Sequence, residues 1–230
     1  MIPKVGFFTS WSEDIYFEKI EIPWVPCKTL VLHWAGSSDS TRTTSLRHAL
    51  FEVWVPTLAI DFSGHGKSSR NTVGSIAKRL EEATAAITLL DTQESISLIG
   101  FSMSWEVSIR LFYQFNVKNL FLFAPGIYNK DVISMPFGDE FTKVLRTHEN
   151  WRNNQISDLL SNFLGNIILF TPENDDVIPE WVNEIIMQSA PKAYTERIVI
   201  PDAPHMIGKW MNENPEQIPQ ILQKIQQFIS

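Results

Sequence analysis

The 230-residue chain has a single cysteine and no apolar run long enough to span a membrane. One cysteine excludes an internal disulfide. Cys27 precedes a strand-like apolar run, so we expect a small buried hydrophobic residue there. A membrane-spanning helix needs about 20 apolar residues, and the first residues lack the apolar core of a signal peptide. These absences predict a cytoplasmic protein with no membrane span.

The chain also lacks clusters of basic residues. It carries 19 Lys and Arg against 26 Asp and Glu, which gives a formal net charge of -7. Nucleic acids and anionic membranes both select concentrated positive charge, so neither is expected as a partner. The histidines are dispersed and form no H-x-x-x-H pair, so no metal site is expected. We predict no cofactor, and the sequence leaves the oligomeric state open.

Short continuous apolar runs recur along the chain, and such runs suit strands that are buried on both faces of a parallel sheet. They lie at 29–33, 57–61, 96–100, 119–124, 166–171 and 197–201. Before them, residues 13–23 alternate between apolar and polar, which is typical of an exposed or edge strand.

Between the runs, apolar residues spaced three and four apart predict helices with one apolar stripe each. These patterns lie at 73–90, 105–112 and 218–228. The alternation predicts an α/β fold, a mostly parallel twisted sheet with helices on both faces. The ligand site of such a sheet lies at the carboxyl ends of its strands.

One interval, which starts at Gly126, is too long for a single helix. We predict a sheet-covering helix at 151–164. A short lid-like insertion is expected at about 127–150, after the sixth strand, with a helix near 141–146. The whole chain, 1–230, is expected to form one domain around this insertion.

The stretch "DFSGHGKSS", residues 61–69, resembles the end of a phosphate-binding loop. Such a loop needs G-x-x-x-x-G-K-[ST] with a helix directly after it. Here Asp61 stands in place of the leading glycine, and the next helical pattern starts only near Thr72. That helix begins too late for its N-terminus to bind phosphate. We therefore predict a tight glycine-containing turn at the end of a buried strand.

A serine stands at a sharp turn in "SLIGFSMSWEVSIRL". Ser102 lies between a predicted strand and a helix that begins by about Met103. This arrangement exposes a nucleophile at the end of a sheet, provided that small residues stand two positions away on either side. Gly100 and Ser104 meet that need. The alternative is that Ser102 is an ordinary helix N-cap.

A serine nucleophile needs a base, and the base needs an acid to orient it. Among five histidines, His205 is the best placed, because it follows the last apolar run in the Pro-bounded loop "PDAPHMIG". The loop after the preceding run supplies Glu173, Asp175 and Asp176. Local reasoning does not choose between the two aspartates.

Together these pieces resemble the α/β-hydrolase superfamily over most of the chain. The order Ser102, Asp175, His205 is the chain order of that family. The resemblance favours Asp175 over Asp176, because the family acid stands four residues before a proline, as Asp175 does before Pro179 in "DDVIP". It also likens "DFSGHGKSS" to the family turn D-x-x-G-x-G-x-S after the fourth strand.

The stretch "TLVLHWAGSS" resembles the His-Gly-x-Gly region of the same family. That resemblance implies an oxyanion hole formed by the backbone N–H groups of Ala35 and Met103. The sequence departs from the family at Trp34, where glycine is usual. We predict that Trp34, Phe101 and Trp105 line an apolar substrate pocket.

The resemblance implies a serine hydrolase. It would cleave a carboxylic ester or thioester of a small to medium apolar acyl group through a covalent acyl-enzyme. The same triad can hydrolyse amide or carbon–carbon bonds, which is one alternative. Another alternative is a binding module without catalysis on the hydrolase scaffold, suggested by Trp34 and Ser104 at two catalytic turns.

Overall fold

The computed structural model describes residues 2–34, 39–92, 94–147 and 153–229. Its centre is an eight-stranded sheet in the order β1-β2-β4-β3-β5-β6-β7-β8. The strands are β1 (Lys4–Ser10), β2 (Glu13–Ile20), β3 (Thr29–Leu32), β4 (Thr57–Ile60), β5 (Ile96–Phe101), β6 (Val117–Phe123), β7 (Asn166–Asn174) and β8 (Tyr194–Pro204). β3 to β8 are parallel to one another, and the hairpin β1–β2 joins β4 antiparallel.

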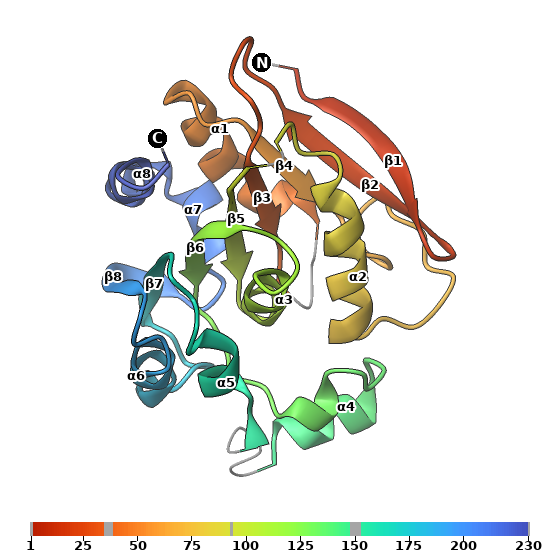
Figure 1. Cartoon of the computed structure of the whole chain (residues 1–230), viewed down its shortest axis with the longest axis vertical. Coiled ribbons are helices and arrows are strands. Elements are labelled where there is room, and N and C mark those ends of the chain that lie inside the picture. Colours follow the sequence, from red (N-terminus) through yellow and green to blue (C-terminus); the bar gives the residue numbers. More distant parts are fainter. Residues whose placement is uncertain (1, 35–38, 93, 148–152, 230) are drawn as a thin grey trace.

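Helices cover both faces of the sheet (Figure 1). They are α1 (Thr44–Glu52), α2 (Ile76–Ile87), α3 (Ser104–Leu111), α4 (Asp139–Leu145), α5 (Ile156–Leu160), α6 (Glu180–Gln188), α7 (Ile207–Glu213) and α8 (Ile218–Gln226). One apolar core lies under α2, α3, α5 and α6, and the other lies under α1, α7 and α8. The predicted α/β fold, a mostly parallel sheet covered on both faces, is confirmed.

The central strands are largely apolar because each of them faces both cores. On β3, Leu30 and Leu32 belong to one core and Val31 to the other. Side chains of a strand alternate between the faces of a sheet, so a strand covered on both sides has no polar face. Cys27 is also buried, as expected, and burial raises the pKa of its thiol to about 12.

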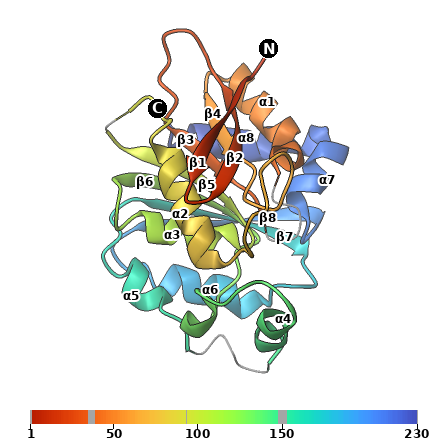
Figure 2. The ribbon, with the colours of Figure 1, turned by 90° about the vertical axis from the view of Figure 1, so that its right-hand side faces the viewer.

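Several elements differ from the sequence predictions. The segment 13–23 is not an edge strand, since β2 lies between β1 and β4. The edge strand on this side of the sheet is β1, which was not predicted because its residues are largely exposed and show no clear pattern. The helix predicted at 151–164 is reduced to α5, and residues 151 and 152 lie outside the described part. α1, α6 and α7 were not predicted. α4 forms in the insertion near the expected position and lies at the lower end of the molecule (Figure 2).

The N-terminal hairpin is tied to the loop that follows β4 through one buried carboxylate. Glu13 is 0% exposed. It accepts hydrogen bonds from Ser69 Oγ at 2.6 Å and from the backbone N–H groups of Asn71 and Thr72, each at 2.9 Å. It also pairs with Lys78 Nζ of α2 at 2.6 Å. Burial alone would raise the pKa of Glu13, but these donors outweigh it and hold the pKa well below its ordinary range.

Replacing Glu13 with glutamine is expected to lower the free energy of unfolding by about 3 kcal/mol, because Lys78 then loses its buried partner. Urea denaturation at pH 7 measures this effect. The control is Glu94→Gln on the surface pair with Lys28, which is expected to change stability little. Equal effects of the two substitutions would contradict the role given to Glu13.

The same carboxylate predicts a dependence of stability on pH. Its pKa is lower in the folded chain than in the unfolded chain, so its stabilisation is present above the ordinary glutamate pKa of about 4.3 and is lost as the pH falls below that value. Between about pH 5 and pH 3 the wild type should therefore lose more stability than Glu13→Gln does. Parallel curves would show that Glu13 does not carry the effect.

Candidate active site

Ser102 stands on a tight turn between β5 and α3. Its φ is +46°, in the left-handed region that side chains other than glycine seldom adopt. The turn is held by a hydrogen bond from the Ser102 N–H to the carbonyl of Phe123 on β6, 2.8 Å long. Within the described chain, no side-chain cap bond forms at the start of α3. The hydroxyl of Ser102 instead faces His205.

Close packing around the turn requires small residues at positions 100 and 104. A Cβ at Gly100 would lie 2.7 Å from Ser108 Oγ and 3.2 Å from the carbonyl oxygen of Ser104. Ser104 is fully buried, and its hydroxyl donates to the carbonyl of His33 at the end of β3. Ser104 therefore fits at this position and ties the start of α3 to the neighbouring strand.

The register of β7 and β8 brings the acid and the base together. Asn174 is paired with Pro204, so the next residues, Asp175 and His205, leave the sheet side by side. His205 Nδ1 lies 3.0 Å from Asp175 Oδ2, and His205 Nε2 lies 3.1 Å from Ser102 Oγ. The three predicted residues thus form one hydrogen-bonded chain across three strand ends.

Asp175 is held as the acceptor of this chain. Its Oδ1 also accepts hydrogen bonds from the N–H groups of Val177 and Ile178, each at 2.9 Å. Burial alone would raise its pKa, but the bonds from His205 and these amides outweigh it and lower the pKa. An ionised carboxylate only accepts, so His205 carries its proton on Nδ1 and presents Nε2 as an acceptor to Ser102. Asp176 is exposed and takes no part.

The structure describes one of the two predicted oxyanion donors, Met103. Met103 directly precedes the first turn of α3, where backbone N–H groups have no partner within the helix. The positive end of the helix dipole adds to this potential. Ala35 lies outside the described residues.

The three predicted pocket residues are packed in the cores. Trp34, Phe101 and Trp105 are 5%, 1% and 0% exposed, and none of them lines a described pocket. Trp34 packs edge-on against Phe101, with ring centroids 5.7 Å apart, and reaches α7 where Gly208 leaves room for its ring. The indole N–H of Trp105 donates to the carbonyl of Gly126.

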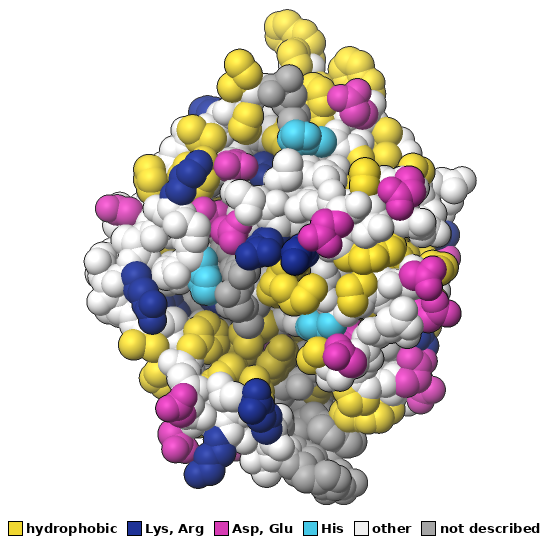
Figure 3. Space-filling view, turned by 180° about the vertical axis from the view of Figure 1, so that it is seen from behind, with side chains coloured by type: hydrophobic (Ala, Val, Ile, Leu, Met, Phe, Trp, Pro, Cys, Tyr) yellow, Lys and Arg dark blue, Asp and Glu magenta, His cyan; other side chains and the backbone are white. Residues whose placement is uncertain are grey.

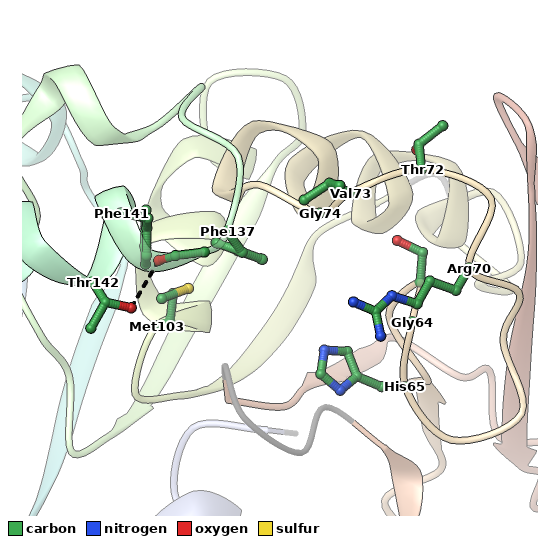
Figure 4. A pocket seen from close by; sticks show the side chains of 12 residues that line it. Gly64, His65, Arg70, Thr72, Val73, Gly74, Met103, Phe137, Phe141 and Thr142 are labelled. Carbon is green, nitrogen blue, oxygen red and sulfur yellow. Dashed lines mark hydrogen bonds between the residues drawn. The ribbon is translucent and has the colours of Figure 1, made fainter.

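A pocket of about 310 Å³ adjoins Met103 instead (Figure 4). It lies between the loop after β4 and the insertion that carries α4. Met103, Phe137 and Phe141 form an apolar wall on one side, and His65 and Arg70 lie on the opposite side. The sequence analysis assigned Met103 to the site but named none of the other residues that line this pocket. The only sequence feature that points to them is that both segments follow the carboxyl ends of strands.

Tyr128, at the beginning of the insertion, also borders the site. It is buried, and Ser102 is among the groups that influence its phenol. Burial is the main cause that raises the pKa of Tyr128, and Glu106 adds to it, while Arg79 and Ser102 oppose it. The phenol therefore stays neutral and can donate or accept a hydrogen bond beside the serine.

The loop 61–69 is closed by its own carboxylate. Asp61 accepts hydrogen bonds from the backbone N–H groups of Ser40 at 2.6 Å and Lys67 at 2.9 Å. Gly66 has a φ of +52°, and a side chain there would collide with the Asp61 carboxylate. The Asp61 carboxyl thus already accepts from the backbone N–H groups of this loop, so the glycines shape a turn at the end of β4.

Metal-ligand clusters and membrane spans are both absent from the described residues. No group of three His, Cys, Asp or Glu side chains in that part of the chain is placed to hold a metal ion. No helix among the described residues has the length and apolar character needed to cross a bilayer. Location in the cell stays a prediction. On the face seen from behind, basic side chains are scattered among acidic ones (Figure 3).

Comparison with known proteins identifies the fold. A proposed hydrolase from Agrobacterium vitis S4 superposes over 100% of both chains, with a TM-score of 0.74 and 16% identity. An esterase from Thermogutta terrifontis matches over 98% of both chains (TM-score 0.72, 17% identity). The thioesterase domain of the curacin biosynthetic pathway matches over 96% of this chain and 100% of its own (TM-score 0.72, 14% identity). The chain has the α/β-hydrolase fold. No family model and no curated protein matches the hydrolase-fold chain by sequence.

Alanine at Gly100 should lower the free energy of unfolding by about 1–3 kcal/mol, because the added methyl group overpacks the turn. Thermal or urea unfolding measures this loss. Ser108→Ala in the same chain removes the nearer of the two clashing atoms and should restore part of the stability. If the double variant is no more stable than Gly100→Ala, the contact with the Ser104 carbonyl oxygen, and not the contact with Ser108, causes the loss of stability.

Proposed function

We propose that this protein is a serine hydrolase that cleaves a carboxylic ester or thioester through a covalent acyl-enzyme. The observation that carries the proposal is the chain from Ser102 Oγ to His205 Nε2, 3.1 Å, and from His205 Nδ1 to Asp175 Oδ2, 3.0 Å. A nucleophile, a base within reach of it and an acid that orients the base are the requirements of this chemistry.

In the proposed first half-reaction, Ser102 Oγ forms a bond to the substrate carbonyl carbon while its proton moves to His205 Nε2. The carbonyl oxygen becomes an oxyanion, and the Met103 N–H is the donor proposed to stabilise it. Asp175 stabilises the imidazolium that forms. The bond to the alcohol or thiol then breaks, and the leaving group takes the proton from His205.

In the second half-reaction, water attacks the acyl-enzyme and gives a proton to His205. The bond between the acyl carbon and Ser102 Oγ breaks, the acid is released and the proton returns to Ser102. Every proton is accounted for by groups already present, so the cycle needs no further co-reactant besides water.

The pocket beside Met103 favours an acyl group of small to medium size. Its volume of about 310 Å³ is at the lower end of the range for small-molecule sites. Two proteins of the same fold are named as an esterase and a thioesterase domain. These names agree with an ester or thioester as the substrate.

Intact mass after incubation with a fluorophosphonate tests the nucleophile without knowledge of the substrate. The wild type should gain one adduct, and Ser102→Ala should gain none and should hydrolyse p-nitrophenyl esters at the background rate. The matched control is Ser161→Ala, since that hydroxyl donates only to the carbonyl of Asp158. An unmodified, folded wild type would overturn the proposal and favour a binding module.

The two neighbouring aspartates offer a second test. Asp175→Asn is expected to lower kcat by about 10³–10⁴-fold, because the amide no longer fixes the imidazole tautomer. Asp176→Asn removes the same charge one residue away and should leave kcat near the wild-type value. Circular dichroism checks that both variants fold. Similar losses in both would point to a general effect of charge in this loop.

A further inference from the structure

The pocket beside Met103 is chemically asymmetric. Figure 4 shows Met103, Phe137 and Phe141 on one side and His65 with Arg70 on the other, both of which face the space between. None of its described lining residues is an Asp or Glu, although the chain carries a net charge of -7. The only full charge on this described lining is therefore positive.

His65 presents a fixed hydrogen-bond donor. Its Nε2 lies 3.1 Å from Arg79 Nη2. A guanidinium has donors only, so Nε2 accepts and the proton of the ring resides on Nδ1. Burial, followed by the charge of Arg79, lowers the pKa of His65 to about 4. Asp39 opposes this shift in the pKa, and Arg70 adds a smaller contribution to it. The ring is thus neutral at pH 7 and offers one N–H.

Arg79 fixes this arrangement from behind. It is buried, and its guanidinium carbon lies 4.9 Å from the ring centroids of both Phe62 and Phe137. Phe137 belongs to the insertion, and its N–H donates to the Gly74 carbonyl at 2.7 Å. The same buried cation therefore orients His65 and supports the apolar wall on the other side of the pocket.

Arg70 supplies the positive charge. Its aliphatic stem lies across Gly64, where a Cβ would be 3.5 Å from Arg70 Cγ and Cδ. It is exposed, and within the described part of the chain it forms no ion pair. Its neighbours Ser69 and Asn71 are both bonded to the buried Glu13. The backbone of Arg70 is held in place while its guanidinium remains available.

We propose that this pocket recognises a carboxylate at the far end of the acyl chain, so that the substrate is an ester or thioester of a dicarboxylic acid. A planar guanidinium binds a carboxylate through two parallel hydrogen bonds, and the His65 N–H adds a third. Methylene groups of the acyl chain contact the apolar wall near Met103. This inference rests on the proposed function. It specifies an acyl group that ends in a carboxylate, where the sequence analysis expected a purely apolar one.

A purely apolar acyl group fits the site less well. Its end would exclude water from Arg70 and from the His65 N–H without replacing the lost hydrogen bonds, which is unfavourable. A carboxylate replaces those bonds with charge-assisted ones, which are shorter and stronger than neutral ones.

The test compares kcat/KM for mono-p-nitrophenyl glutarate with kcat/KM for p-nitrophenyl pentanoate, which have similar length and share a leaving group. The wild type should prefer the glutarate, and Arg70→Gln should lower the ratio by about tenfold or more. Arg146→Gln, at the exposed end of α4 and outside the pocket, removes the same charge and should preserve the ratio. Added salt should weaken the preference.

A wild type that prefers the pentanoate, or equal changes in the two arginine variants, would overturn the inference. If the fluorophosphonate labels Ser102 but no preference for glutarate appears, the hydrolase proposal survives and this inference alone fails. If no ester is turned over, calorimetric titration of Ser102→Ala with monomethyl glutarate decides. Weaker binding after Arg70→Gln supports the carboxylate site, and unchanged binding rejects it.

Discussion

The left-handed backbone at Ser102 is the constraint on which the site depends. Holding a side chain other than glycine in this region costs of the order of 1–3 kcal/mol, and the surrounding packing offsets that cost. The Ser102 N–H is bonded to β6, and Ser104 joins the start of α3 to the end of β3. Because these contacts come from the ends of β3 and β6, on either side of β5, the conformation at Ser102 depends on the pairing of these three strands.

Much of this arrangement is visible in the sequence, because the parallel sheet leaves simple signals. Strands covered on both faces are largely apolar, and residues directly after them gather at one edge, so the amino-acid order alone is enough to group Ser102, His205 and an acid from the loop that follows residue 171. Local sequence cannot choose between Asp175 and Asp176. The choice depends on the pairing of Asn174 with Pro204 between strands that are separate in the chain.

The pocket could not be predicted in the same way. Trp34, Phe101 and Trp105 lie close to the nucleophile in sequence or at neighbouring strand ends, but burial in the cores takes them away from the described pockets. The walls come instead from two segments whose contact depends on Arg79 and Phe137. α1, α6 and α7 were missed, as was β1, whose residues are largely exposed and show no clean alternation.

The hairpin β1–β2 lies at one edge of the sheet, outside the parallel strands β3 to β8. Glu13 nevertheless ties it to the proposed site, because its carboxylate accepts hydrogen bonds from both neighbours of Arg70. The hairpin and the loop after β4 are therefore structurally coupled. A hairpin taken from another protein of this fold would hold the loop around Arg70 in place only if it carried a carboxylate at the position of Glu13. The position of Arg70 thus depends on a residue that is remote from it in the sequence.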